Sequence, residues 1–232
     1  QFDTYDGQVV PGVVRIDSKG RLDPTFNADL PLPFIGRESE IPALERFQYA
    51  VIALQGGGYL LGGKLGLVAL NTSGANRPET VFRTLGGVFS LVQQYDGGIV
   101  AGGDFTLMSG FVRASMARLS PDFRIDLTLD VGTGPNAPVR TLLRSPDGAL
   151  YALGSFTSFN GQPRPAGIAK LGPRGQLDLG YNPPLAPVTA AGDFSSIANG
   201  NSRPSAGRLD AIRAGQVQPN GGLVVSNGSA TA

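Results

Sequence analysis

Two stretches of sixteen residues in this chain are nearly the same: YDGGIVAGGDFTLMSG at 95–110 and PDGALYALGSFTSFNG at 146–161. Each starts with an Asp-Gly pair, continues through an apolar segment and ends in a Phe-Thr block followed by Gly. Shorter relatives, LQGGGYLLGGKL and VQPNGGLVVSNGS, occupy 54–65 and 217–229. Asp-Gly and Asn-Gly between apolar segments indicate hairpins, because a type I′ turn needs positive φ at both central residues. We therefore expect a chain built from a repeated β-hairpin.

Two further blocks follow each hairpin. The first has a small or acidic residue, Phe, a hydroxyl residue and then Gly, and it begins at Asp104, Ser155 and Asp193. The second has Arg or Lys, an apolar residue, a turn and then Leu or Ile followed by Asp, as in 113–129 and 164–181. The whole unit is predicted to run strand, turn, strand, Phe-Thr loop, strand, turn, strand. Its Phe is expected in the core between neighbouring units, because aromatic side chains bury large areas.

The repeat length and the composition together select the fold class. The turn glycines Gly57, Gly97 and Gly148 are 40 and 51 residues apart, and four-stranded propeller blades run about 40 to 50 residues per repeat. The 34 Gly and 18 Pro supply tight turns rather than disorder, since 41% of residues are hydrophobic and the net charge is only +1. The sequence predicts an all-β fold: a β-propeller-like array of four-stranded antiparallel blades, with about four to five units.

The ends of the chain carry complementary parts of the unit. Late-unit sequence lies near the N-terminus and early-unit sequence near the C-terminus. This arrangement suits a ring closed by pairing the N- and C-terminal strands, and it equally suits a slice of a longer repeat array. We expect a single domain over 1–232, divided into units at about 47–85, 88–130 and 139–181, a degenerate unit at 186–210, a unit that combines 13–27 with 211–229, and an insertion at 28–46.

Two units, with 139–183 as the clearest, resemble the delta-60 type β-propeller repeat of bacterial surface and secreted proteins, and the other units match it in part. The resemblance rests on PDG at 146–148, GSFTSFNG at 154–161, IAKL at 168–171 and LDPTFN at 22–27. It implies a propeller fold and an extracellular or cell-surface location in bacteria. The family has no established catalytic motif, so the resemblance implies no chemistry.

The residue types present restrict catalysis. The chain has no His and no Cys, which removes Ser-His and Cys-His nucleophile pairs and the usual zinc ligands. A glycosidase-like carboxylate pair remains, with Asp104, Asp193 and Glu79 as candidates. Asp104 and Asp193 recur at equivalent repeat positions, however, where an Asp that caps backbone N–H groups is expected. Asp126 and Asp130 are too few for a calcium loop, so we expect no cofactor and no metal.

The charge pattern narrows the partners. Charged residues make up 16% of the chain and the arginines are spread along it, which argues against a nucleic-acid partner. Apolar runs fall well short of the ~20 residues of a membrane span. We expect a non-catalytic extracellular or cell-surface binding or structural module that contacts a protein partner or a surface polysaccharide, as in adhesion or a larger envelope assembly. The alternative is a propeller-type carbohydrate-active enzyme that uses an Asp/Glu pair.

The binding residues are expected where the repeat is interrupted, because such departures can carry a specific contact. Two segments qualify, 28–46 and 195–208. Aromatic and Arg side chains dominate the centres of interfaces. The predicted anchors are Phe34, Arg37 and Phe47 in or beside the first segment and Arg203 and Arg208 in or beside the second.

Overall fold

The computed structural model describes residues 4–10, 12–30, 48–64, 66–165, 167–183, 212–219 and 222–227. These residues form antiparallel strands and a single short 3-10 helix, η2 (Pro78–Thr80). The predicted all-β class is confirmed.

Three consecutive sheets form the body of the protein. The second sheet is four-stranded and antiparallel, in the order β12-β11-β8-β7, and matches the predicted blade. In the first and third sheets the fourth strand is reduced to one bridge, Leu70–Asn76 or Leu171–Leu177. The strands are β3 (Gln48–Ala53), β4 (Tyr59–Gly63) and β5 (Gly66–Leu70) in the first sheet, β7 (Val88–Gln93), β8 (Ile99–Gly103), β11 (Met116–Leu119) and β12 (Ile125–Asp126) in the second, and β13 (Val139–Arg144), β14 (Leu150–Gly154) and β17 (Ile168–Leu171) in the third.

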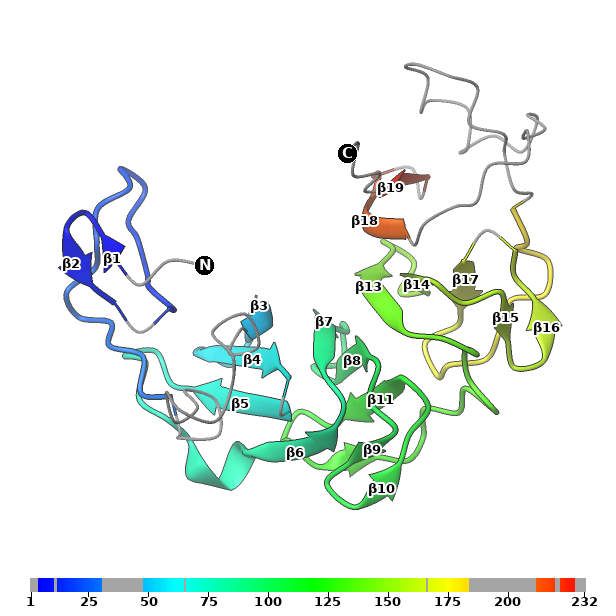
Figure 1. Ribbon diagram of the computed structural model, residues 1–232, viewed down its shortest axis with the longest axis horizontal. Coiled ribbons are helices and arrows are strands. Elements are labelled where there is room, and N and C mark those ends of the chain that lie inside the picture. Colours follow the sequence, from blue (N-terminus) through cyan, green and yellow to red (C-terminus); the bar gives the residue numbers. More distant parts are fainter. Residues whose placement is uncertain are drawn as a thin grey trace.

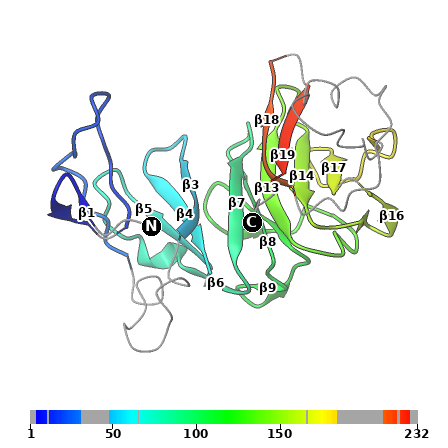
Figure 2. The same cartoon turned by 45° about the horizontal axis from the view of Figure 1, so that its top comes forward.

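The sheets follow one another around an open arc (Figures 1 and 2). Their first strands, β3, β7 and β13, contact in turn, and β13 then contacts β18 (Ile212–Val217). The hairpin of β18 and β19 (Leu223–Asn227) lies at one end of the arc, and β1 (Thr4–Tyr5) and β2 (Gln8–Val9) lie at the other. In the described part of the chain β19 pairs with β18 alone. Closure through 13–27 and 211–229 therefore stays a prediction.

The Asp-Gly hairpin tips of the second and third sheets differ from the predicted type I′ turn. The Gly97 N–H donates to the Gln94 carbonyl (3.0 Å), and the Gln94 N–H donates to the Gly98 carbonyl (2.7 Å). Positive φ falls on Gly97 (84°) and not on Asp96, which is a type I turn followed by a left-handed Gly. Asp96 instead accepts the Gly98 N–H (3.0 Å) on its carboxylate. The type I′ prediction was wrong here, because the Asp serves as a side-chain cap.

Type I′ geometry occurs instead within the Phe-Thr block, which we had expected to be a loop. The block folds into a small hairpin, and both central residues of each turn have positive φ: Ser109-Gly110 (47° and 86°) and Asn160-Gly161 (47° and 71°). The hairpin of β1 and β2 turns in the same way at Asp6-Gly7 (49° and 73°). The other two hairpins are β9 (Leu107–Met108) with β10 (Phe111–Val112) and β15 (Ser158–Phe159) with β16 (Gln162–Pro163), and β6 (Phe82–Leu85) joins the first sheet to β9.

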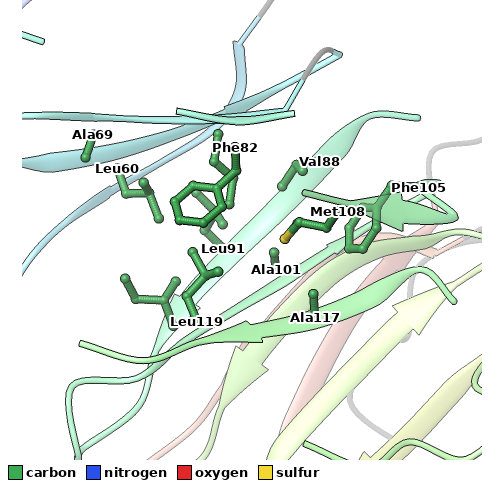
Figure 3. Packing of buried hydrophobic residues seen from close by; sticks show 12 residues of the cluster. Leu60, Ala69, Phe82, Val88, Leu91, Ala101, Phe105, Met108, Ala117 and Leu119 are labelled. Atoms are coloured by element: carbon green, nitrogen blue, oxygen red, sulfur yellow. The ribbon is translucent and has the colours of Figure 1, made fainter. Parts of the chain in front are cut away.

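The core lies between successive sheets. Between the first and second sheets, Leu60 and Phe82 meet Leu91 and Leu119 (Figure 3). Similar clusters separate the second sheet from the third and the third from β18 and β19. The repeat Phe residues are buried as predicted, with Phe105 0% and Phe156 1% exposed.

The last of these interfaces gives a prediction for alkaline pH. The Tyr181 ring packs edge-on against the Tyr151 ring, with 5.4 Å between centroids. Burial, with a smaller contribution from Tyr151, raises the pKa of Tyr181 to about 12. The unfolded state therefore loses this proton first, near pH 10, and the stability that the neutral phenol contributes is lost between pH 10 and 12. We expect Tyr181→Phe to reduce the loss of unfolding free energy over this range by about 1 to 2 kcal/mol in urea titrations. An unchanged pH profile would contradict the assignment.

Candidate functional site

The predicted anchors cannot be placed. Phe34, Arg37, Phe47, Arg203 and Arg208 all lie outside the described residues. At the start of the 28–46 insertion, Ala28 and Leu30 are each 7% exposed and pack against β4 and β5.

The candidate catalytic carboxylates do not form an evident pair. Asp104 is exposed and accepts the Gly87 N–H, which is the capping role that its repeat position predicts. Glu79 is exposed in the first turn of η2, and Asp193 lies outside the described residues. Among the described residues no group of three or more Asp, Glu, His or Cys side chains could hold a metal ion. No helix in the described part of the chain is long and apolar enough to cross a membrane.

The second repeat block contains the two residues of an ion pair between the third and fourth strands of the unit. The basic residue comes from the third strand and the carboxylate from the fourth, in three pairs: Arg15–Asp23 (2.8 Å), Arg118–Asp126, and Lys170–Asp178 (3.9 Å). Each carboxylate also accepts the N–H of the second residue after it: Thr25 (2.8 Å), Thr128 (2.8 Å) and Gly180 (2.9 Å). The repeated Arg or Lys and Asp residues therefore have a structural role, which is to pair the third strand with the fourth, and no catalytic role is needed to explain them.

At Arg118 the ion pair is part of a larger cluster between the second and third sheets. Arg118 also pairs with Asp96 of the hairpin tip and donates to the side-chain amide oxygen of Gln94 (2.7 Å). The Gln94 side-chain amide in turn donates to the Pro173 carbonyl of the third sheet (3.0 Å). The Arg118 and Asp126 side chains are only 11% and 14% exposed. Although burial raises the pKa of Asp126, hydrogen bonds from Thr128 and the Arg118 charge hold it below its usual value. The cluster is compact, and both of its carboxylates are held ionised.

The first sheet departs from this pattern at both ion-pair positions and at the hairpin tip. The Arg77 N–H donates to the Ala69 carbonyl (2.9 Å) in the register that joins Asp178 to Lys170 (2.9 Å). Ala69 thus stands where the other units carry Arg or Lys, and Arg77 stands where they carry Asp. At the hairpin tip, Gly56 stands where the second sheet has Asp96. The three positions carry a formal charge of +1 here and −1 in the second sheet.

A pocket of about 220 Å³ lies at this break, between the first and second sheets. In the described part of the chain the Arg77 guanidinium has no ion-pair or hydrogen-bond partner. Gln93 is already engaged, since it accepts the Gln55 N–H (2.9 Å) and donates to the Gly97 carbonyl (3.0 Å). The lining consists of Leu54, Gln55, Gly56, Gly57 and Arg77 from the first sheet and Gln93, Gly97, Ile99, Pro121 and Phe123 from the second. The arrangement can receive an anion at a half-buried cation.

A second hollow, of about 570 Å³, lies beside residues 25–30 and 73–75. Asp29 is the charged side chain in its lining, together with the hydroxyl groups of Thr25 and Ser73. The described residues that line it bring no cation to the hollow, so the Arg77 pocket is the candidate site.

The sequence contains a signal for this site that our interpretation missed. ALNTSGANR at 69–77 aligns without a gap to RLSPDFRID at 118–126, which places Ala69 opposite Arg118 and Arg77 opposite Asp126. The predicted binding residues lie in or beside the long interrupted segments, whereas this departure from the repeat consists of single-residue changes within a regular unit.

A family model described as "Domain of unknown function (DUF5122) beta-propeller" matches residues 1–26, 94–128 and 145–181. This match supports a β-propeller repeat family. The matched stretches contain the three ion pairs, and they do not include residues 48–80, where the pattern breaks. The comparison with curated proteins found no match.

Proposed function

We propose that the protein is a non-catalytic binding module, in which consecutive antiparallel sheets form a frame and the Arg77 pocket receives part of a partner. The observation that carries this proposal is the replacement of a closed ion-pair cluster by a cation that has no partner among the described residues and lies beside a cavity. An arginine without a partner is poorly explained by stability alone, since a half-buried charge loses hydration that only a partner restores.

We further propose an extracellular or bacterial cell-surface location and a partner that is a protein or a surface polysaccharide. The support is the resemblance of residues 139–183 to repeats of bacterial surface and secreted proteins. A carbohydrate-active enzyme is the weaker proposal, because Asp104 already caps the Gly87 N–H.

The proposal is tested by capture on a panel of immobilised neutral and acidic surface polysaccharides, with a panel of glycosides assayed for turnover. Arg77→Gln should lose capture by about tenfold or more, because a charge-assisted hydrogen bond contributes about 1.5–3 kcal/mol. Arg83→Gln is the matched control, since Arg83 is exposed on β6 and the change in net charge is the same. Equal capture by the two variants would contradict the pocket as the binding site, and glycoside turnover abolished by Asp104→Asn would contradict a non-catalytic role.

A further inference from the structure

We infer that the Arg77 pocket is a carboxylate site for a compact sugar acid, such as a uronic acid residue of a polysaccharide; this inference rests on the proposed function and specifies its ligand. The other units show what complements a cation at this place between sheets. Arg15 is paired with Asp23, Arg118 with Asp96 and Asp126, and Lys170 with Asp178. At Arg77 the cation is present and the carboxylate is missing from the described residues, so a carboxylate from a ligand would complete the set.

Arginine is suited to this partner. Its planar guanidinium offers paired N–H donors that match the two oxygens of a carboxylate, which gives a short, directional, charge-assisted contact. In the neighbouring interface the Arg118 guanidinium donates one N–H to the Asp126 carboxylate and another to the Asp96 carboxylate. Carboxylate is therefore the anion that pairs with arginine in the neighbouring interface.

The size and lining of the pocket favour a compact ligand. A volume of about 220 Å³ equals the space of roughly seven water molecules and is smaller than the ~300–1,000 Å³ of sites for drug-sized ligands. Phe123 and Pro121 offer apolar contact to the carbon face of a sugar ring, and the exposed Gln55 can exchange hydrogen bonds with hydroxyl groups. A single sugar acid is compact and has the carboxylate, the apolar ring face and the hydroxyl groups that these side chains can contact.

A substitution at Gly56 can supply the missing carboxylate from the protein itself. A Cβ built on Gly56 meets nothing within 4 Å, and the residue does not have positive φ, so a side chain fits without strain. The residue that aligns with it, Asp96, caps its own turn through the Gly98 N–H and also pairs with Arg118. Gly56→Asp should thus place an internal carboxylate at the rim that it shares with Arg77. Gly56→Asn is the matched control, because Asn caps the same turn without charge.

The test is isothermal titration calorimetry of the whole chain with sodium D-glucuronate, D-glucose and sodium sulfate. Wild type and Gly56→Asn should bind glucuronate at least tenfold more tightly than glucose, and Gly56→Asp and Arg77→Gln should weaken glucuronate binding at least tenfold. Circular dichroism melts of the two Gly56 variants, expected at or above the wild-type temperature, check that the fold is intact.

The outcomes separate the two proposals. If glucose or sulfate binds as well as glucuronate and Arg77→Gln loses that binding, the carboxylate inference is overturned while the pocket remains a binding site. If Gly56→Asp binds glucuronate like wild type, or if glucuronate does not bind at all, the inference is likewise overturned. The proposed function fails separately, if polysaccharide capture is also independent of Arg77.

Discussion

Deleting residues 218–232 should lower the melting temperature by roughly 10 °C or more, because the deletion removes β19 and uncovers apolar core worth several kcal/mol. Leu223 of β19 is 6% exposed and packs in one cluster with Tyr151, Leu153 and Ile168 of the third sheet. Without β19, β18 also loses its hydrogen-bonding neighbour. Differential scanning calorimetry of the shortened chain measures the effect.

The control is deletion of 228–232, which leaves β18 and β19 whole. Ring closure makes the expected effect larger and cooperative. In the complete sheets the third strand pairs with the second, with Leu119 opposite Ile99 and Leu171 opposite Leu150, and by equivalence a closed ring places Ile16 opposite Leu223. A melting temperature unchanged by the larger deletion would contradict closure and favour an open array.

Replacing Arg118 with Ala should cost about 1.5–3 kcal/mol, because it leaves the largely shielded Asp126 carboxylate without its cation. The side-chain amide oxygen of Gln94 loses its donor in the same step. For Lys170→Ala, about 1 kcal/mol or less is expected, since the Lys170–Asp178 contact is long (3.9 Å) and both side chains are more exposed. Urea unfolding of both variants measures the difference.

A double-mutant comparison shows whether the cost of Arg118→Ala arises from the unpaired carboxylate. Arg118→Ala combined with Asp126→Asn should be more stable than Arg118→Ala alone, because the buried charge is removed along with its partner. If the single variant loses under 1 kcal/mol, or if the second change adds to the loss, the ion pair does not stabilise the interface as described.

The repeat predicted the sheets well because hairpins and blade lengths are encoded locally. Turn residues at 40- to 50-residue spacing, with apolar segments between them, were sufficient for the four-stranded second sheet and for the burial of Phe105 and Phe156. The turn types could not be obtained in this way. In the sequence, Asp96-Gly97 and Asn160-Gly161 are equally good signals for a type I′ turn. In the structure, positive φ falls on one residue of the first pair and on both residues of the second.

The candidate site was not predicted because its meaning depends on register. Arg77 stands out only when the strand register is known. Its N–H donates to the Ala69 carbonyl, and at this pair of positions the other units have an ion pair. The sequence instead drew attention to interrupted segments and to Asp104, whose carboxylate caps a backbone N–H. The net charge in this interface depends on three positions that only the fold brings together, and composition alone does not reveal it.

The most direct test of the site is a ¹⁵N heteronuclear single-quantum NMR titration of the protein with sodium D-glucuronate. The account predicts saturable shifts at the amides that border the pocket, at Gln55, Gly56 and Gly97 above all, with the same pattern in Gly56→Asn and none in Gly56→Asp. Shifts concentrated around the hollow at 25–30 and 73–75, or a pattern that Gly56→Asp leaves unchanged, would contradict the assignment of Arg77 as the binding site.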